Sequence, residues 1–358
     1  MAKLTMPKIN ITFESIAASI IAHSSKGVVL LILRDTALGG KHYTITDVTE
    51  IPEGLSAANQ RQIKNALIGY VDPPKKVLVH VIDSGENTLT AALKWAATQG
   101  FDYLCGPADV TAEEAETIGT WIKSQRANNY AIYKAVLPDY AGDSEAIVNF
   151  SASGIETADG TYTAAEYCSR IAGLIAGTPM RISSTYATLP EVMDVTRLTI
   201  SEQDEAVGAG KYILWSDGMH VLTGRAVNSL QTTTDIKGDQ FKKIKLVEII
   251  DMMHYDIRTA VRTDYIGKYA NTYANKMLLV AVIRGYMQTL EADSLINSGW
   301  ELDLDVSAQK AWLEANGTDT SEMTTQQIRE ADTGSHVFLK MSCKPLDAIE
   351  DVDLVISI

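Results

Sequence analysis

The chain has 358 residues, of which 45 are acidic and 31 basic, so its formal net charge is −14. This balance disfavours nucleic acid and anionic membrane surfaces as general partners, because both repel an acidic protein. The three cysteines, Cys105, Cys168 and Cys343, have no metal-type spacing and argue against a disulfide framework. No apolar run approaches the roughly 20 residues of a membrane span, and no signal-peptide pattern opens the chain. We therefore expect a product that is made in the cytoplasm and is large enough for two domains.

Strand patterns stand at both ends of the chain. Apolar residues alternate with polar ones there, at Ile9, Ile11 and Phe13 and again at Val352, Leu354, Ile356 and Ile358. An apolar strand without a partner invites aggregation, so soluble proteins avoid one unless it is added to the sheet of another chain. Strand physics alone leaves two alternatives open, pairing within the subunit or pairing with a neighbouring copy.

The first two hundred residues alternate between strand and helix patterns. Strands are expected over 27–34, 75–82, 101–105, 130–136 and 147–150, and helices over 56–67, 88–98, 111–129 and from 163 onward. Two of the helices begin with capping boxes, at Thr111 and Thr163. In the last helix, Ala172, Gly173 and Ala176 suit close packing against a neighbour. This alternation predicts an α/β fold.

A change of pattern near residue 215 suggests a domain boundary. Two short strand patterns flank Asp217-Gly218, a signal for a β-hairpin. Two long helices follow, whose apolar residues recur at spacings of three and four. The stripes are Val247, Ile250, His254, Ile257 and Val261 on the first helix, and Leu279, Val282, Ile283, Tyr286 and Leu290 on the second.

The last part of the chain predicts two further strands, over 301–306 and 337–344, with a helix and surface loops between them. Glu301, Asp303 and Asp305 have the alternate spacing of a carboxylate cluster. On a strand such residues more simply form a solvated edge that prevents unwanted pairing. A calcium site is the weaker interpretation.

No pattern in the sequence predicts a catalytic, cofactor or metal site. Gly208-Ala209-Gly210-Lys211 is a turn rather than a phosphate loop, because Glu205 and Tyr212 stand where that loop needs a glycine and a Ser or Thr that reaches magnesium. The histidines lack zinc-site spacing, and neither serine nor cysteine occurs in a nucleophile elbow. His254 is expected to be a buried core or interface side chain.

One local excess of positive charge stands out in this acidic chain. It consists of Lys237, Lys242, Lys243 and Lys245. Lysines at a helix N-terminus oppose the helix dipole, so helix stability does not explain them. They are either a solubilising surface or a patch that faces an acidic partner.

Several segments, in this order and spacing, resemble contractile tail sheath proteins. The likeness covers the first 35 residues and about 223–358, and is nearest to the sheaths of Gram-positive phages, defective prophages and phage-tail-like bacteriocins of the R-type or diffocin-like kind. The segments are Met6–Ile11, Ser24–Val29, Gly224–Thr232, Lys242–Arg258, Asn271–Leu290, Ala308–Glu314 with Thr333–Leu339, and the closing strand.

The resemblance implies a two-domain α/β (α+β) sheath fold with extended terminal arms. The arms would be residues 1–24 and 345–358, the outer domain 25–215 and the conserved inner domain 216–344. Hexameric rings would stack helically around a tail tube and contract to drive it through a cell envelope. The arm strands, Ile9, Ile11, Phe13, Val352, Leu354, Ile356 and Ile358, would pair with sheets of neighbouring copies, with flexible hinges at 14–25 and 344–351.

Further expectations concern the partners. The inner domain would hold the tube, through the lysine cluster or through Arg258 and Arg262. Baseplate and tail terminator proteins would complete the particle, which assembles in the cytoplasm of a bacterial host and is then released. No nucleic acid, membrane, metal or cofactor takes part, and the protein is not an enzyme. The alternatives are an α/β enzyme that binds a nucleotide or small molecule, and another structural protein of the tail.

Overall fold

The computed structural model describes residues 21, 27–83, 85 and 88–357. The chain divides into two compact units. Ser24–Tyr255 and Pro345–Ile358 form the first, which we call the α/β unit, and Met1–His23 and Asp256–Lys344 form the second, the helical unit. The predicted strand at Ile9, Ile11 and Phe13 lies outside the described residues, as does Ile358.

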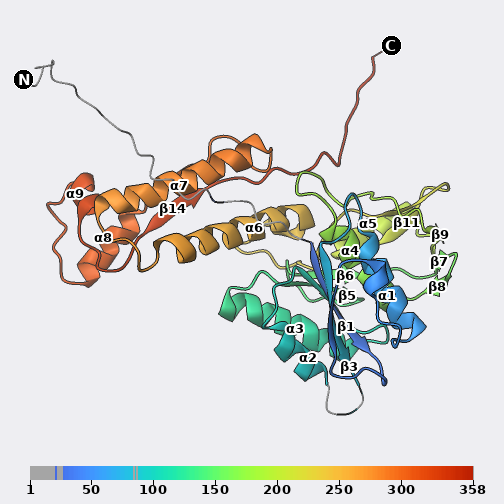
Figure 1. Ribbon diagram of the computed structural model, residues 1–358. Coiled ribbons are helices and arrows are strands. Elements are labelled where there is room, and N and C mark those ends of the chain that lie inside the picture. The colour runs from blue at the N-terminus through green and yellow to red at the C-terminus, as the bar shows by residue number, and fades with distance from the viewer. Residues whose placement is uncertain (1–20, 22–26, 84, 86–87, 358) are drawn as a thin grey trace, which may run out of the picture. The chain divides into compact units, whose positions relative to one another are not determined.

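A seven-stranded sheet forms the centre of the α/β unit (Figure 1). Its strands are, in sheet order, β10 (Lys211–Tyr212), β6 (Ile147–Phe150), β5 (Lys134–Pro138), β4 (Tyr103–Cys105), β1 (Val28–Arg34), β3 (Lys76–Ile82) and β2 (His42–Ile45). All pairs are parallel except β2 with β3. Parallel strands are buried on both faces, which explains the unbroken apolar runs that the sequence shows.

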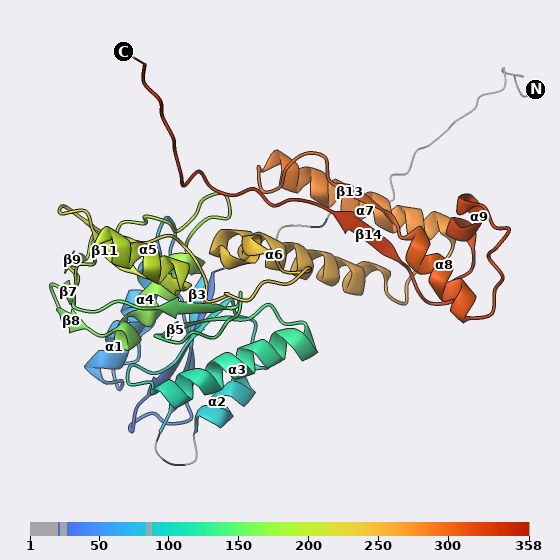
Figure 2. The same cartoon turned by 180° about the vertical axis from the view of Figure 1, so that it is seen from behind.

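Helices cover both faces of this sheet. In β1, Val29 and Leu31 pack on one side with α1 (Ala57–Ile68) and α4 (Ala164–Ala176), and Leu30 packs on the other with α2 (Leu89–Ala96) and α3 (Ala112–Asn129). The two views in Figures 1 and 2 show the same division.

Both predicted capping boxes are present, because Thr111 and Thr163 each accept a hydrogen bond from the backbone N–H group three residues on. Gly173 lets α4 approach α1 closely: a Cβ atom there would lie 2.0 Å from the Ala66 carbonyl oxygen. Helix α3 ends at Tyr130, which has a left-handed φ of 53°. The predicted strand 130–136 therefore begins only at Lys134.

Smaller elements complete the α/β unit. Three short strands that the sequence did not reveal, β7 (Ile155–Thr157), β8 (Gly160–Tyr162) and β9 (Val192–Asp194), make a separate sheet. Helix α5 (Ile200–Gly208) leads through Gly210, with a φ of 73°, into β10. The Gly-Ala-Gly-Lys segment is thus the predicted turn.

The predicted hairpin forms from β11 (Leu214–Ser216) and β12 (Val221–Thr223), and the Asp217 carboxylate accepts hydrogen bonds from two backbone N–H groups of the turn. The chain does not leave the α/β unit there. Ser229 donates its N–H to the carbonyl of Ile147 in β6 at 2.8 Å. This bond holds the segment after the hairpin against β6. The two compact units divide between Tyr255 and Asp256, whereas the predicted domain boundary lies near residue 215.

Helix α6 (Ile244–Ala260) passes from the first unit into the second and ends in a π-helical turn, Val261–Tyr265. The helical unit also contains the long helix α7 (Tyr273–Ala292), the hairpin of β13 (Glu301–Leu304) and β14 (Leu339–Ser342), and the helices α8 (Val306–Ala315) and α9 (Thr325–Glu330). The predicted apolar stripe of α7, from Leu279 to Leu290, is buried.

The three alternating carboxylates near β13 have separate roles. Arg329 forms two hydrogen bonds with Asp303, at 2.7 and 2.8 Å, and this contact lowers the pKa of Asp303. Asp305 caps α8 by accepting a hydrogen bond from Ala308, and Glu301 is exposed. Because Asp303 and Asp305 are engaged in separate contacts, the arrangement does not support a calcium site.

Candidate assembly site at the C-terminal segment

The C-terminal segment is fixed to the α/β unit at Glu350, whose side chain is only 5% exposed. The Glu350 carboxylate accepts hydrogen bonds from Thr185 Oγ1 at 2.6 Å, Lys243 Nζ at 3.0 Å and Ser183 Oγ at 3.2 Å. Ser183 and Thr185 stand in the connection between α4 and β9, and Lys243 directly precedes α6. We call this group, with Arg225 described below, the Glu350 clamp.

Two ion pairs flank the clamp. Lys243 also contacts Asp347 at 2.5 Å, and Arg225 pairs with Asp351 while its Nε lies 3.8 Å from Glu350. Burial alone lowers the pKa of Lys243, but its hydrogen bonds to Asp347 and Glu350 outweigh burial and raise it. The hydrogen bond to Asp351 raises the pKa of Arg225. The cationic side of the clamp therefore stays charged at any physiological pH.

This clamp contradicts the predicted hinge at 344–351, since Asp347, Glu350 and Asp351 are all bound to the α/β unit. The signal in the sequence was three carboxylates within five residues before an apolar strand, Asp347 to Asp351. Their partners lie more than a hundred residues away in the chain. Spacing therefore did not reveal them.

Immediately beyond the clamp the chain becomes exposed. The exposed fractions are 78% for Val352, 77% for Leu354, 89% for Val355 and 73% for Ile356. No strand partner accompanies these residues within the described chain. We call Val352–Ser357 the apolar arm. Its root is held and its apolar side chains face solvent, which is how a segment meant for another chain's sheet would be presented.

The β13–β14 hairpin has one open edge. Asp305 donates its N–H to the Phe338 carbonyl at 2.9 Å. Along an antiparallel strand, the backbone N–H and C=O groups of successive residues point alternately toward and away from the partner strand, so those of Leu339 and Met341 point away from β13. On the opposite edge, Arg284 donates two hydrogen bonds to the Leu302 carbonyl. Among the residues that the structure describes, no strand pairs with this edge of β14, and a two-stranded sheet gains stability from further strands.

The four lysines do not form one exposed patch. Lys237 pairs with Glu145 at 2.7 Å, Lys242 with Asp239 at 2.9 Å, and Lys243 belongs to the clamp. Lys245 is only 6% exposed, and burial lowers its pKa. Arg258 and Arg262, the other predicted candidates, are exposed side chains of the helical unit.

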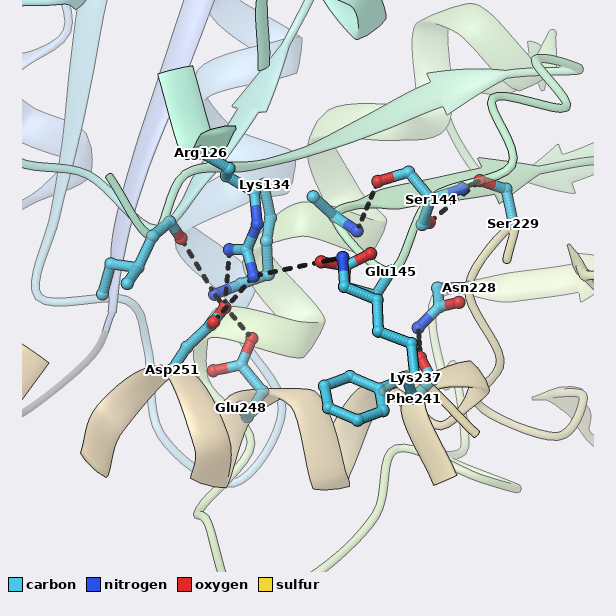
Figure 3. A network of polar contacts seen from close by, with 12 residues as sticks. Arg126, Lys134, Ser144, Glu145, Asn228, Ser229, Lys237, Phe241, Glu248 and Asp251 are labelled. Carbon is cyan, nitrogen blue, oxygen red and sulfur yellow. Dashed lines mark hydrogen bonds and ion pairs between the residues drawn. The ribbon is translucent and has the colours of Figure 1, made fainter. Parts of the chain in front are cut away.

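A buried ionic network joins the first half of α6 to the sheet (Figure 3). Asp251 accepts two hydrogen bonds from Arg126, at 2.8 and 2.9 Å, and one from Lys134 at 3.1 Å. Glu248 lies 3.3 Å from Lys134 and accepts the hydroxyl of Tyr103. The Lys134 side chain is only 3% exposed. Burial alone would lower the pKa of Lys134, but the negative charges of Glu248 and Asp251 outweigh burial, so the pKa is raised.

This network explains an error in the predicted stripe of α6. Glu248 and Asp251 are buried, whereas His254 is exposed and Ile250 is half-buried. Apolar periodicity assigns carboxylates to the solvent side, and here two of them are buried because basic residues from β5 and α3 neutralise them. His254 is therefore not a core side chain, and its predicted place in an interface between subunits stays a prediction.

Other kinds of site find no support. Across the described ranges, no three His, Cys, Asp or Glu side chains gather in a way that could hold a metal ion. Among the same residues, no helix combines the length and apolarity needed to cross a membrane.

Comparison with known proteins defines the class. The model of the phage tail sheath protein central domain matches residues 84–229, and that of the phage tail sheath C-terminal domain matches residues 237–358. The chain therefore belongs to the phage tail sheath family, whose members are structural proteins rather than enzymes. The tail sheath protein of Clostridium phage phiCD119 is 36% identical over 351 residues, which cover 97% of each chain.

Solved structures share the fold. The sheath tail protein from Desulfitobacterium hafniense matches with a TM-score of 0.70 at 19% identity, over 83% of this chain and 94% of that one. A chain of the anti-feeding prophage baseplate matches with a TM-score of 0.65 at 13% identity, over 99% of both chains. These findings confirm the predicted fold class and the family resemblance.

The ionic network yields a prediction about stability. Replacing Asp251 by Asn leaves Arg126 and Lys134 buried without their shared carboxylate, which should lower the free energy of unfolding by about 3–5 kcal/mol. Asp239→Asn removes an exposed carboxylate that pairs with Lys242 and should cost less than about 1 kcal/mol. Urea unfolding followed by circular dichroism compares the two. Equal losses would mean that the buried network does not stabilise the α/β unit.

The clamp yields a second prediction. Glu350→Ala should spare the fold but release the root of the arm, so that thermolysin cleaves before Leu346 and Ile349 faster than in the original chain. Asp353→Ala, a change at an exposed side chain beyond the clamp, should leave these rates unchanged. Mass spectrometry of the early fragments identifies the cut sites. Unchanged cleavage in the Glu350 variant would show that the clamp does not hold the segment.

Proposed function

We propose that this chain is the repeating subunit of a contractile sleeve, in which six copies form a ring and rings stack helically around a tail tube. The observation that carries the proposal is the apolar arm. Its first residues are held by the clamp and its apolar side chains are exposed, an arrangement that suits pairing with a neighbouring copy rather than packing within the same chain. The membership in the sheath family supports the same conclusion.

The edge of β14 is the proposed acceptor of the arm. The arm of one copy adds to the open edge of β14 in the next copy, and the N-terminal strand at Ile9, Ile11 and Phe13 joins such a sheet in the same way. Backbone hydrogen bonds supply affinity, and the alternating apolar side chains set the register. Every subunit is then linked to its neighbours by strands of its own chain.

Contraction requires no nucleotide in this proposal. The extended sleeve is a kinetically trapped state, and contraction releases free energy as subunits bury more of their surfaces against one another. The arms keep the copies connected while the subunits move. Since the clamp holds Asp347–Asp351, the hinge of the C-terminal link lies in the arm beyond Asp351 or before Asp347.

The tube contact is assigned to the end of α6 and the turn after it. Arg258, Arg262 and Lys268 are exposed there, together with Ile266 at 67% and Tyr269 at 47%. A basic and partly apolar surface on an acidic chain suits an acidic tube. The particle also contains baseplate and tail terminator proteins, assembles in the bacterial cytoplasm and leaves the cell complete.

The arm is tested by truncation. Removing Val352–Ile358 keeps the clamp and should give a folded, soluble subunit that no longer forms sleeves, as judged by circular dichroism, size exclusion and negative-stain microscopy. Leu354→Asp combined with Ile356→Asp should act alike, whereas Asp353→Asn should still assemble. Sleeves of normal length from the truncated chain would refute the role of the arm, and unfolding would mean that the strand completes its own subunit.

The tube contact is tested by charge reversal. Arg258→Glu with Arg262→Glu should preserve the fold and the sleeves but reduce the fraction of particles that contain a tube, most strongly at low salt, because salt screens contacts between exposed charges. Lys242→Glu, next to the exposed Asp239, is the matched control and should leave tube filling unchanged. Tube-filled, extended particles at normal yield from the double variant would place the tube contact elsewhere.

A further inference from the structure

Two imidazoles meet at the edge of the seven-stranded sheet. His42 in β2 and His80 in β3 are register partners, and their Nδ1 atoms lie 2.8 Å apart. The ring of Trp95 in α2 stacks on His42, with a centroid separation of 4.7 Å and an interplanar angle of 3°. His80 is 4% exposed, whereas His42 is exposed. The edge strand β2 is thus joined to β3 by a side-chain contact as well as by its backbone.

The hydrogen bond between the two Nδ1 atoms holds one proton. The Nε2 atom of His80 is buried and has no hydrogen-bond partner. A proton on that atom would be a buried donor without an acceptor, so the favourable arrangement has His80 donating from Nδ1 and His42 accepting. In this arrangement the neutral His42 ring has its proton on Nε2.

A second proton has no good position in this arrangement. On Nδ1 of His42 it removes the acceptor and sets two N–H donors against each other. On Nε2 of His80 it creates a buried cation without a counter-ion. The first position breaks the side-chain contact between the two strands, and the second leaves a buried charge without compensation, so each disfavours the closed strand pair.

Within the described part of the chain, no carboxylate acts on His80 to compensate the extra charge. His80 lies on the sheet face that carries Leu78 and Ile82 of its own strand, Ile32 of β1, and Ala92 and Ala96 of α2. The charged residues nearest in sequence are Lys41 before β2, Lys94 in α2 and Asp83 after β3; both lysines are exposed, and Asp83 is half-buried. Among the described residues, His42 is the one titratable group that changes the pKa of His80, and it acts to lower it.

We propose that the pair of His42 and His80 is an acid-sensitive latch, which releases the edge strand β2 from β3 when the pH falls, before the rest of the α/β unit opens. The released strand leaves the apolar β3 as a new sheet edge, which is prone to pair with other chains. At low pH the sheet therefore exposes the edge of β3, which can pair with strands of other chains.

The direction of the effect follows from proton linkage. Burial, with a contribution from His42, lowers the pKa of His80 to about 4, whereas an imidazole in an opened strand has a pKa near 6.5. Between pH 4 and pH 6.5, His80 therefore binds a proton more readily when β2 is released than when it is paired with β3. The latch is therefore closed above pH 6.5 and loosens progressively as the pH falls toward 4.

Hydrogen exchange of the full chain, followed by mass spectrometry at pH 7.5 and pH 5, tests the latch. After correction for intrinsic exchange rates, the protection of residues 42–45 should fall roughly ten- to thirtyfold at the lower pH. Protection of β5 and β6 should stay constant. Constant protection of residues 42–45 across this range would overturn the proposal.

The double variant His42→Asn with His80→Asn removes both titrating rings and should abolish the pH dependence, even if its β2 is looser at both pH values. His42→Asn alone, at an exposed position, keeps an acceptor for His80 and should weaken the pH dependence. His220→Asn changes an exposed histidine of the β11–β12 hairpin and should retain the full effect. An unchanged pH dependence in the double variant would show that other groups open the strand.

Discussion

The buried Glu350 carboxylate separates the folded body of this chain from the strand that it presents. A carboxylate that has left water needs several donors to compensate for lost hydration, and Thr185, Ser183 and Lys243 provide them. The following residue is paired with Arg225, and from there on the side chains face solvent. A polar contact placed directly before an apolar strand also prevents that strand from collapsing onto its own subunit. The division between held and free residues within the C-terminal segment depends on this one contact.

The ionic network beneath α6 resembles the clamp in one respect. In both places, charged residues that look like surface in the sequence are buried, because opposite charges from distant parts of the chain meet them. Lys134 and Arg126 come from β5 and α3, and their partners Glu248 and Asp251 follow more than a hundred residues later. Buried ion pairs contribute little net stability compared with apolar packing, but they penalise any other arrangement strongly. They fix the orientation of α6 on the sheet.

The sequence predicted elements whose signals are local. The capping boxes at Thr111 and Thr163, the Asp217-Gly218 turn and the apolar stripe of α7 all depend on residues a few positions apart, and each is present. The short strand His42–Ile45 carries too few residues to show a period. The burial of Glu248, Asp251 and Glu350 depends on partners that only the folded chain brings together. For the candidate site, the sequence showed the alternating apolar residues of the arm, whose pairing with a neighbouring copy stays a prediction, and it did not reveal the clamp.

The edges of the central sheet bear on how such a subunit can accumulate in a cell. Strand β10 at one edge has only two residues, and β2 at the other has four and runs antiparallel to its neighbour. Neither offers a long row of unpaired backbone groups as a template. Strands of another copy therefore find little backbone to pair with at either edge of the central sheet, which limits wrong contacts between copies.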